Sequence, residues 1–339
     1  MPFTLRRVNP LDTTAVDAWW GAYAAAERAD RGADAVVWTL EESRAELQQK
    51  SATVDRRAYL VCDGESLVGS ASLALPLKDN THLARLQVSV PLAHRRRGVG
   101  SRALGLLEDE AVAAGRTTAH AAAAWPHSLG IDGAGSPGRE FARRHGYTLA
   151  LGDVMSRLDL PTDRSALRPL EDAVAAATPA YGIRSWTGRV PEDLIDRWAI
   201  LDASLDTEAP VGDKHIEEQA PDSASIRESD DLIERQRRLS FGTIALAPDG
   251  SAAAYSQLVV STDDGNAYQW GTLVRTPHRG RRLGLAVKLA NLRMLETQAP
   301  EVTAVYTFNA ESNTHMLAVN TALGFHPAER LGELQKVLG

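Results

Sequence analysis

Two basic segments that contain glycine are suited to binding a phosphate group. Residues 95–100 read RRRGVG, and residues 281–286 read RRLGLA. Each segment follows an apolar run typical of a strand, residues 84–90 or 267–274, and precedes a long segment with helical periodicity. The start of a helix offers backbone N–H groups without partners and the positive end of the helix dipole, small residues let an anion approach the backbone, and arginines add charge. The sequence therefore predicts two phosphate-binding loops.

The two segments differ from the common nucleotide-binding motifs. No Gly-Lys-Ser/Thr follows the glycines, as a Walker A loop requires. The third glycine and the ribose-binding acid of a dinucleotide-binding motif are not at their places either. A solvated basic turn is the remaining alternative. Because strand, loop and helix occur twice in one chain, we favour phosphate binding over that alternative.

The elements that position the loops occur in the same order in both halves of the chain. Each half opens with a short strand-like run and an amphipathic helical segment, and continues with apolar strands divided by turn residues. After the basic loop and its helix come another strand, a helix that ends in Gly-aromatic, and a last strand. Residues 161–182, which contain three prolines and room for a short helix, connect the halves. We therefore expect a duplication, with an N-terminal domain at residues 1–160 and a C-terminal domain at residues 183–339.

Both loops resemble motif A of the GNAT superfamily of N-acetyltransferases, Gln/Arg-x-x-Gly-x-Gly/Ala, which holds the pyrophosphate of coenzyme A. The second half also resembles the family's next conserved segment, through residues at the spacing of that segment: Asn309, Asn313, Met316, Asn320, Gly324 and Phe325. The tandem arrangement is similar to that of mycothiol synthase and of actinobacterial antibiotic N-acetyltransferases. The resemblance implies an α/β (α+β) fold of two tandem GNAT-like domains, each a mixed, mostly antiparallel sheet with splayed central strands flanked by helices.

The resemblance also implies acetyl-CoA as the cofactor and identifies the residues that hold it. In the first half these residues are Arg95, Arg97, Gly98 and Gly100. In the second half they are Leu273, Val274, Arg279, Arg281, Arg282, Leu283, Gly284, Leu285, Ala286, Asn309, Asn313, Met316 and Asn320. In GNAT domains a backbone N–H on the strand before the loop polarises the thioester carbonyl, so the strand that ends at Val274 is expected to supply that group.

The tyrosine with which GNAT enzymes protonate the leaving thiolate is absent from both halves. Its position falls on Asn320 in the second half and on Ala142 in the first. The thiol of coenzyme A has a pKa near that of cysteine, roughly 8.5, so it can leave as a thiolate. We therefore expect acetyl transfer without a strong acid, and a minor catalytic role for Asn320.

An amine acceptor also needs a base, because an alkylamine is almost fully protonated at neutral pH. Four acids occur where GNAT domains place the substrate-binding helix and loop: Asp202, Asp206, Glu208 and Asp213. Asp202 and Asp206 are four residues apart and would share one face of a helix. We expect Asp206, Glu208 or Asp213 to be the base, and Asp202 and Asp206 to bind the acceptor. A solvated helix end is the alternative.

Two aromatic residues precede the second loop, and the first half differs from the second after its loop. Tyr268 and Trp270 alternate along the predicted strand, so they share one face, where they either line the acceptor cleft or pack beneath the helical segment at residues 192–205. Packing is the favoured role for Trp270. The first half has a glycine-rich run at residues 131–138 in place of the asparagine-containing segment. We therefore expect catalysis in the C-terminal domain and a catalytically degenerate N-terminal domain.

Composition limits the remaining classes of function. The net charge of −7 disfavours a nucleic-acid partner and suits a cationic acceptor. The apolar runs are too short to span a membrane, and the nine histidines show no metal-ligand spacing. The single cysteine, Cys62, and the lack of an apolar leader favour a reducing compartment, so we expect a cytoplasmic protein.

These observations predict an acetyl-CoA-dependent N-acetyltransferase. We expect it to move an acetyl group, by direct attack, to a primary amine of a small cationic metabolite or antibiotic, such as a peptide antibiotic or an aminoglycoside. Mycothiol-type amine acetylation is the enzymatic alternative, and a non-catalytic acyl-CoA-binding regulatory protein is the alternative of another class. We expect a monomer or homodimer that has no metal, nucleic-acid or membrane partner.

Overall fold

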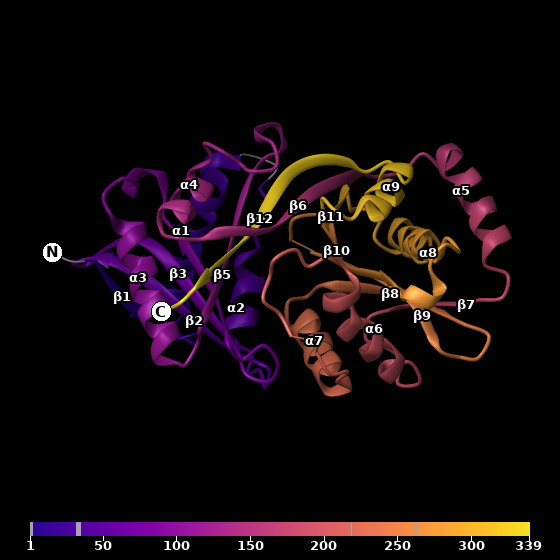
Figure 1. The fold of residues 1–339 in the computed structure, drawn as a ribbon, viewed down its shortest axis with the longest axis horizontal. Coiled ribbons are helices and arrows are strands. Elements are labelled where there is room, and N and C mark those ends of the chain that lie inside the picture. Colours follow the sequence, from indigo (N-terminus) through magenta and orange to yellow (C-terminus); the bar gives the residue numbers. More distant parts are fainter. Residues whose placement is uncertain (1–2, 32–34, 218, 262) are drawn as a thin grey trace. The chain divides into compact units, whose positions relative to one another are not determined.

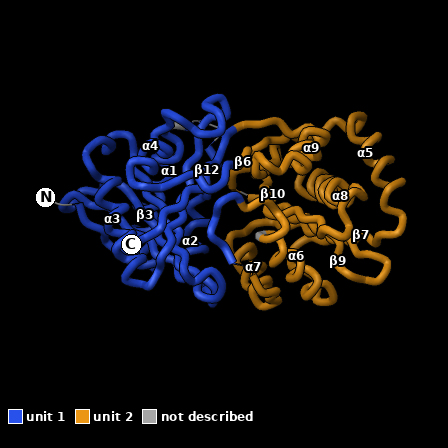
Figure 2. Tube along the Cα trace, in the orientation of Figure 1, with its two compact units in different colours: residues 1–152, 212–217, 329–339 blue, residues 153–211, 218–328 orange. Residues whose placement is uncertain are grey.

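The chain forms two compact units. The computed structural model describes residues 3–31, 35–217, 219–261 and 263–339, with the backbone alone of Asp30 and Asp206 (Figure 1). Unit 1 consists of residues 1–152, 212–217 and 329–339, and unit 2 consists of residues 153–211 and 218–328 (Figure 2). Each unit has its own mixed sheet and flanking helices, which confirms the α/β fold class and the two-domain arrangement.

The sheet of unit 1 has the strand order β1-β2-β3-β4-β5-β12. The strands are β1 (Thr4–Arg7), β2 (Val54–Asp63), β3 (Ser66–Pro76), β4 (Leu83–Ser89), β5 (Thr118–Pro126) and β12 (His326–Val337). The helices are α1 (Thr13–Arg31), α2 (Leu40–Gln48), α3 (Val99–Ala113) and α4 (Pro137–Arg144). One apolar cluster joins the sheet to α3, and a second joins it to α1, so α3 and α1 cover different faces.

The sheet of unit 2 has the strand order β6-β11-β10-β9-β8-β7. The strands are β6 (Thr148–Asp159), β7 (Gly182–Thr187), β8 (Leu239–Leu246), β9 (Ala252–Val260), β10 (Asn266–Val274) and β11 (Ala304–Ala310). The helices are α5 (Arg164–Ala177), α6 (Ile195–Glu208), α7 (Ser223–Arg235), α8 (Leu283–Gln298) and α9 (Thr314–Ala322). Helices α6 and α8 cover opposite faces of β8, β9 and β10 (Figure 1). The predicted connector is the helix α5, which packs on α8 through Leu167 and its neighbours.

The last strand of each half of the chain belongs to the sheet of the other unit. Residues Asp153–Asp159 of β6, which close the first half, pair antiparallel with β11 in unit 2. Residues Glu329–Val337 of β12, which close the second half, pair antiparallel with β5 in unit 1. The boundaries of the compact units therefore differ from the predicted domain boundaries at residues 160 and 183. Hydrogen bonding between strands, and not their order in the chain, decides to which unit these strands belong.

Candidate functional site

The two basic loops hold an arginine in the same way. Arg95 donates from Nε to the carbonyl oxygen of Val90 (2.8 Å), and Arg279 donates from Nε to that of Val274 (3.2 Å). Each arginine also donates from Nη2 to a main-chain carbonyl of a helix in its own unit, α1 in unit 1 (3.2 Å) and α6 in unit 2 (3.0 Å). Arg95 and Arg279 are therefore equivalent positions.

Each loop has two residues in the left-handed conformation, one arginine and one glycine. The arginine comes first in unit 1, and the glycine comes first in unit 2. In unit 1 these are Arg96 (φ 64°) and Gly98 (φ 83°), and in unit 2 they are Gly280 (φ 78°) and Arg282 (φ 55°). Gly98 is the N-cap of α3, and Arg282 is the N-cap of α8. Alternating left-handed residues turn successive N–H groups inward and form a concave anion site.

The register assigned to the second loop from the sequence is wrong by two residues. The loop begins at Arg279, so Gly284 corresponds to Gly100 and not to Gly98. The motif appeared to fit residues 281–286 because Arg282 replaces the glycine expected at the helix start. The N-cap conformation fixes the register, and the spacing of arginine and glycine in the sequence does not.

The helix starts after both loops present backbone N–H groups. The first intrahelical hydrogen bonds are donated by Arg102 in α3 and by Ala286 in α8. The amides of residues 99–101 and 283–285 precede these bonds and point out of the helix, as the geometry of a helix start requires. Leu283 and Leu285 bury their side chains in the core of unit 2. The groups of these two residues that could face a ligand are therefore their backbone amides.

A glycine in each first turn leaves little room for a side chain. A Cβ at Gly100 would lie 3.2 Å from the ring of Phe141, and a Cβ at Gly284 would lie 3.4 Å from Val274. A branched side chain at either position must push its neighbours or fill the space in front of the amides. Both units therefore have, at Gly100 and Gly284, the small residue that the sequence predicted for an anion-binding loop.

Two further loop arginines, Arg97 and Arg281, have hydrogen-bond partners. Arg97 donates from Nη2 to Asp63 (3.2 Å) in unit 1. In unit 2, Arg281 donates from Nη1 to the hydroxyl of Tyr181 (2.6 Å), and that hydroxyl also lies 3.2 Å from Nδ1 of His278. His278 thus packs in the turn, and Tyr181 fixes Arg281.

The central parallel strands separate in both units, but only unit 2, within the described residues, has a bulge beside the gap. The parallel ladder of β4 and β5 ends at Arg85, and that of β10 and β11 ends at Gln269. In β10 the register against β9 shifts between Gln269 and Gly271, which makes Trp270 an extra residue. A bulge leaves the extra residue's backbone groups out of the ladder. The N–H of Trp270 is therefore available beside the splayed strands.

Two asparagines of the second half, Asn309 and Asn320, are hydrogen-bonded to each other, and Asn320 is buried. Asn320 is 1% exposed and donates from Nδ2 to Oδ1 of Asn309 (2.6 Å), which also accepts from Thr307 (3.4 Å). Asn313 caps its own helix by accepting from the N–H of Met316 (3.2 Å). Asn320 therefore orients Asn309, and neither its burial nor its chemistry suits a proton donor.

The described residues show contacts for two of the four candidate acids, Glu208 and Asp213. Glu208 accepts from the N–H and the hydroxyl of Thr276 (2.7 and 2.8 Å) and pairs with Arg279 (3.4 Å). It therefore anchors the loop of unit 2. Asp213 belongs to unit 1, where its N–H donates to the carbonyl of Ala150 (2.9 Å). Asp202 is exposed on α6, and the side chain of Asp206 lies outside the described residues.

Comparison with known proteins agrees with this geometry. Residues 19–126 match the family described as Acetyltransferase (GNAT) family. The whole chain is similar to a tandem GNAT protein from the clavulanic acid biosynthesis pathway, solved without AcCoA, with 26% identity, a TM-score of 0.78 and 99% of each chain covered. A GCN5-related N-acetyltransferase from Sphaerobacter thermophilus has the same fold, with 15% identity, a TM-score of 0.68, and coverage of 99% of this chain and 96% of that chain. Among curated proteins, none matches the chain.

The chain has the fold of a tandem GNAT acyltransferase. The family match falls on the half that keeps glycine at the N-cap of its loop helix, namely Gly98. The matched residues include the basic loop of unit 1, residues 95–100.

The two aromatic residues of this GNAT enzyme's β10 differ from their expected roles. Tyr268 is buried, donates its hydroxyl proton to Asp264 (2.6 Å) and stacks on Tyr306 (5.8 Å between ring centroids). Trp270 is 36% exposed, with the guanidinium of Arg238 over its ring (5.5 Å). The expectation that Trp270 packs beneath the helix is wrong, because the bulge takes it out of the regular alternation; other aromatic residues pack beneath α6.

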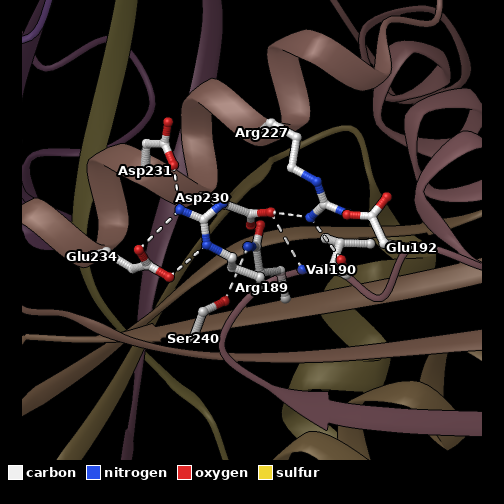
Figure 3. A network of polar contacts seen from close by, with 9 residues as sticks. Arg189, Val190, Glu192, Arg227, Asp230, Asp231, Glu234 and Ser240 are labelled. Atoms are coloured by element: carbon white, nitrogen blue, oxygen red, sulfur yellow. Dashed lines mark hydrogen bonds and ion pairs between the residues drawn. The ribbon is translucent and has the colours of Figure 1, made fainter.

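The densest acidic group of unit 2 is structural. On α7, Asp231 and Glu234 pair with Arg189, and Asp230 accepts from Arg227 (2.8 Å; Figure 3). Burial raises the pKa of Asp230, and the bond from Arg227 opposes that rise. These pairs hold α7 against the segment that precedes α6, so their charges are neutralised within the fold.

Sequence reasoning missed one buried cation. Lys288, in the second turn of α8, is 2% exposed, and its Nζ has no hydrogen-bond partner among the described residues. It lies 5.4 Å from the ring centroid of Phe325. Burial lowers the pKa of Lys288 to about 7. The helix has little amphipathic pattern, so no periodic signal marked this position as internal.

The described residues also bear on metal and membrane binding. In the described ranges, no three His, Cys, Asp or Glu side chains are grouped to hold a metal ion. No helix in those ranges is both long and apolar enough to cross a membrane.

Proposed function

We propose that this protein is an acetyl-CoA-dependent N-acetyltransferase in which unit 2 moves an acetyl group to a primary amine by direct attack. The observation that carries the proposal is the bulge at Trp270, which lies on the strand that leads into a helix start suited to a pyrophosphate. The corresponding strand of unit 1, β4, pairs with β3 in regular register. Unit 1 is proposed to be catalytically degenerate.

The residues of unit 2 fit acetyl-CoA. Outward amides at the start of α8, the small Gly284 and the loop arginines suit a pyrophosphate. When bound, acetyl-CoA supplies an acetyl group activated as a thioester. Arg279, Arg282 and the α8 amides would hold the pyrophosphate. The N–H of Trp270 would stabilise negative charge on an acyl oxygen, as a fixed hydrogen-bond donor does.

Proton removal is assigned to α6. Glu208 is engaged by Thr276, and Asp213 belongs to unit 1. We therefore assign to Asp202 and Asp206 the attraction of an ammonium group and the removal of its proton, directly or through water. Asn320 supplies no acid. No acid from the protein would be needed for the leaving thiolate, since a thiol pKa of roughly 8.5 makes its departure feasible near neutral pH.

The acceptor is proposed to be a small cationic molecule, such as an amine-bearing peptide antibiotic or an aminoglycoside. The net charge of −7 favours a cation. The similar tandem protein comes from a biosynthetic pathway for a small molecule, clavulanic acid, which supports a small acceptor over a protein. A mycothiol-type amine is the second candidate. The buried free Cys62 is consistent with a cytoplasmic protein, and a monomer or homodimer completes the proposal.

A thiol-release assay tests the proposal. Acetyl-CoA is offered with a panel of amine antibiotics and amino sugars, and two matched variants, Gly284→Val and Gly100→Val, are compared with the wild type. We expect Gly284→Val to raise KM for acetyl-CoA strongly and Gly100→Val to leave turnover nearly intact. The opposite result would assign catalysis to unit 1. Kinetics equal to those of the wild type in both variants would exclude both loops from the mechanism.

A further inference from the structure

The start of α4 in unit 1 carries polar groups that have no hydrogen-bond partner among the described residues. The first intrahelical bond of α4 runs from the N–H of Glu140 to the carbonyl of Ser136 (3.0 Å). Pro137 has no N–H, so the amides of Gly138 and Arg139 are the donors that the helix leaves without partners. Ser136, the N-cap, is 3% exposed, and its hydroxyl neither caps the helix nor bonds any other described residue.

Arg139 adds a positive charge at the same place. Nε and Nη1 of its guanidinium are shut off from solvent and have no hydrogen-bond partner among the described residues. Long side chains on a helix lean toward its N-terminus, so a residue in the first turn directs its head group past the helix start. Burying an unpaired guanidinium is costly, and proteins normally pair such a group with an anion.

The equivalent helix of unit 2 does not share this feature. There the N-cap residue Asn313 accepts from the N–H of Met316 (3.2 Å) and so satisfies its own helix start. Serine is as good an N-cap as asparagine, yet Ser136 makes no such bond. The free groups of α4 are therefore a property of unit 1 and not of the fold.

Hydrogen bonds hold the segment before α4, residues 127–136, and engage the carboxylate of its first turn. The loop before α4 is fixed on Trp125, whose Nε1 donates to the carbonyl of Gly130 (2.9 Å). Arg330 lies 3.2 Å from Nε2 of His127, and burial together with Arg330 lowers the pKa of that histidine. The nearby carboxylate of Glu140 is engaged by Arg143 and by a backbone N–H.

The topology of unit 1 places this site at the same sheet edge as its basic loop. Strands β4 and β5 are parallel, α3 follows β4, and α4 follows β5. Helices that follow parallel strands begin at the same edge of the sheet, where α/β proteins bind ligands. In unit 1 the starts of α3 and α4 therefore lie at one edge of the sheet.

We propose that unit 1 binds an oxyanion at the start of α4, held by the guanidinium of Arg139, the hydroxyl of Ser136 and the amides of Gly138 and Arg139. The ligand group is a phosphate or a carboxylate. A phosphate would come from coenzyme A, outside its pyrophosphate, and a carboxylate would come from a second small ligand. Unit 1 thus has a binding function that does not depend on which unit transfers the acetyl group.

Calorimetry on the full-length chain tests this site without any activity measurement. The probes are inorganic phosphate, acetate, coenzyme A and 3′-dephospho-coenzyme A. The variants are Arg139→Gln and Ser136→Ala, with Arg143→Gln, an exposed arginine of the same helix, as the matched control. Loss of a charge-assisted hydrogen bond corresponds to about tenfold weaker binding or more. We expect that loss for Arg139→Gln, a smaller one for Ser136→Ala, and none for Arg143→Gln.

The probes also separate the two sources of the anion. If the site takes the 3′-phosphate, removing that phosphate weakens binding to the wild type and makes no difference to Arg139→Gln. If it takes a carboxylate, coenzyme A and its dephospho form bind alike, and acetate affinity falls in Arg139→Gln. Equal affinities of wild type, Arg139→Gln and Arg143→Gln for all four probes would overturn the proposal, and Ser136→Ala serves for the comparison if Arg139→Gln does not fold.

Discussion

Arg282 occupies in α8 the left-handed N-cap position that Gly98 occupies in α3. A left-handed conformation costs a residue with a Cβ roughly 1–2 kcal/mol, so the arginine is held there at some expense. Its guanidinium is therefore expected to contribute to anion binding where Gly98 contributes only backbone.

Replacing Arg282 tests that contribution. Arg282→Gly keeps the backbone conformation and removes the charge, so KM for acetyl-CoA should rise about tenfold, the scale of a charge-assisted hydrogen bond. Stability should change little, because relief of the left-handed strain is offset by the greater flexibility of glycine in the unfolded chain. Arg282→Lys, which keeps a positive charge, is the control in the same kinetic assay. An unchanged KM in Arg282→Gly would show that the arginine does not contact the cofactor.

Glu208 should behave as an anchor of the loop and not as a base. Glu208→Gln weakens the bonds to Thr276 and Arg279, so KM for acetyl-CoA should rise while the shape of the pH–rate profile stays the same. Steady-state kinetics across a range of pH gives both quantities. Loss of the rising limb of the profile in this variant would instead make Glu208 the base.

The acids of α6 are expected to govern proton transfer. Asp202→Asn and Asp206→Asn remove a carboxylate with little change in size. The variant that loses the true base should lose roughly a hundredfold in kcat/KM, the usual scale of general base catalysis. In the wild type, activity should climb with pH as the acceptor amine loses its proton. If both variants stay within a few-fold of wild type, the base lies outside α6.

Asn320 should matter for structure more than for chemistry. Asn320→Ala removes the partly buried bond to Asn309, which should lower the free energy of unfolding by about 1 kcal/mol. Its kcat should fall only modestly, since the native side chain supplies no acid. Chemical denaturation and kcat measured on one preparation separate the two effects. A large fall in kcat at unchanged stability would assign Asn320 a direct role.

Lys288 should destabilise the fold in a pH-dependent way. Its pKa falls from 10.5 in the unfolded chain to about 7 in the folded state, so between these values the unfolded chain binds a proton that the folded protein does not. The resulting penalty is largest below the folded pKa and is relieved, by about 1.4 kcal/mol per pH unit, as pH rises toward the unfolded value.

Lys288→Met removes that penalty with little change in volume. The variant should have a higher Tm than wild type at about pH 6, and the difference should shrink toward about pH 10. Lys50→Met, a change at an exposed lysine, is the control for charge alone. A difference in Tm that is constant across this range would mean that Lys288 is not neutral in the folded protein.

Local sequence patterns predicted the duplicated order of strands, loops and helices, because each element carries its own periodicity and turn residues. They did not predict the register of the second loop, since Arg282 fills a left-handed position normally given to glycine. They grouped Asp213 with Glu208 although a tertiary hydrogen bond to Ala150 draws Asp213 into the other unit. Lys288 gave no signal, because its burial depends on neighbours distant in the chain.

The exchange of β6 and β12 has a consequence for how such a protein can evolve. A gene cut at the connector would encode two halves, each of which carries the closing strand of the other half's sheet and lacks its own. Each half would then expose the unpaired edge of β5 or β11, and exposed strand edges promote aggregation. Selection for one active half therefore retains both, so the degenerate unit 1 that we propose would be free to acquire a new ligand but could not be deleted.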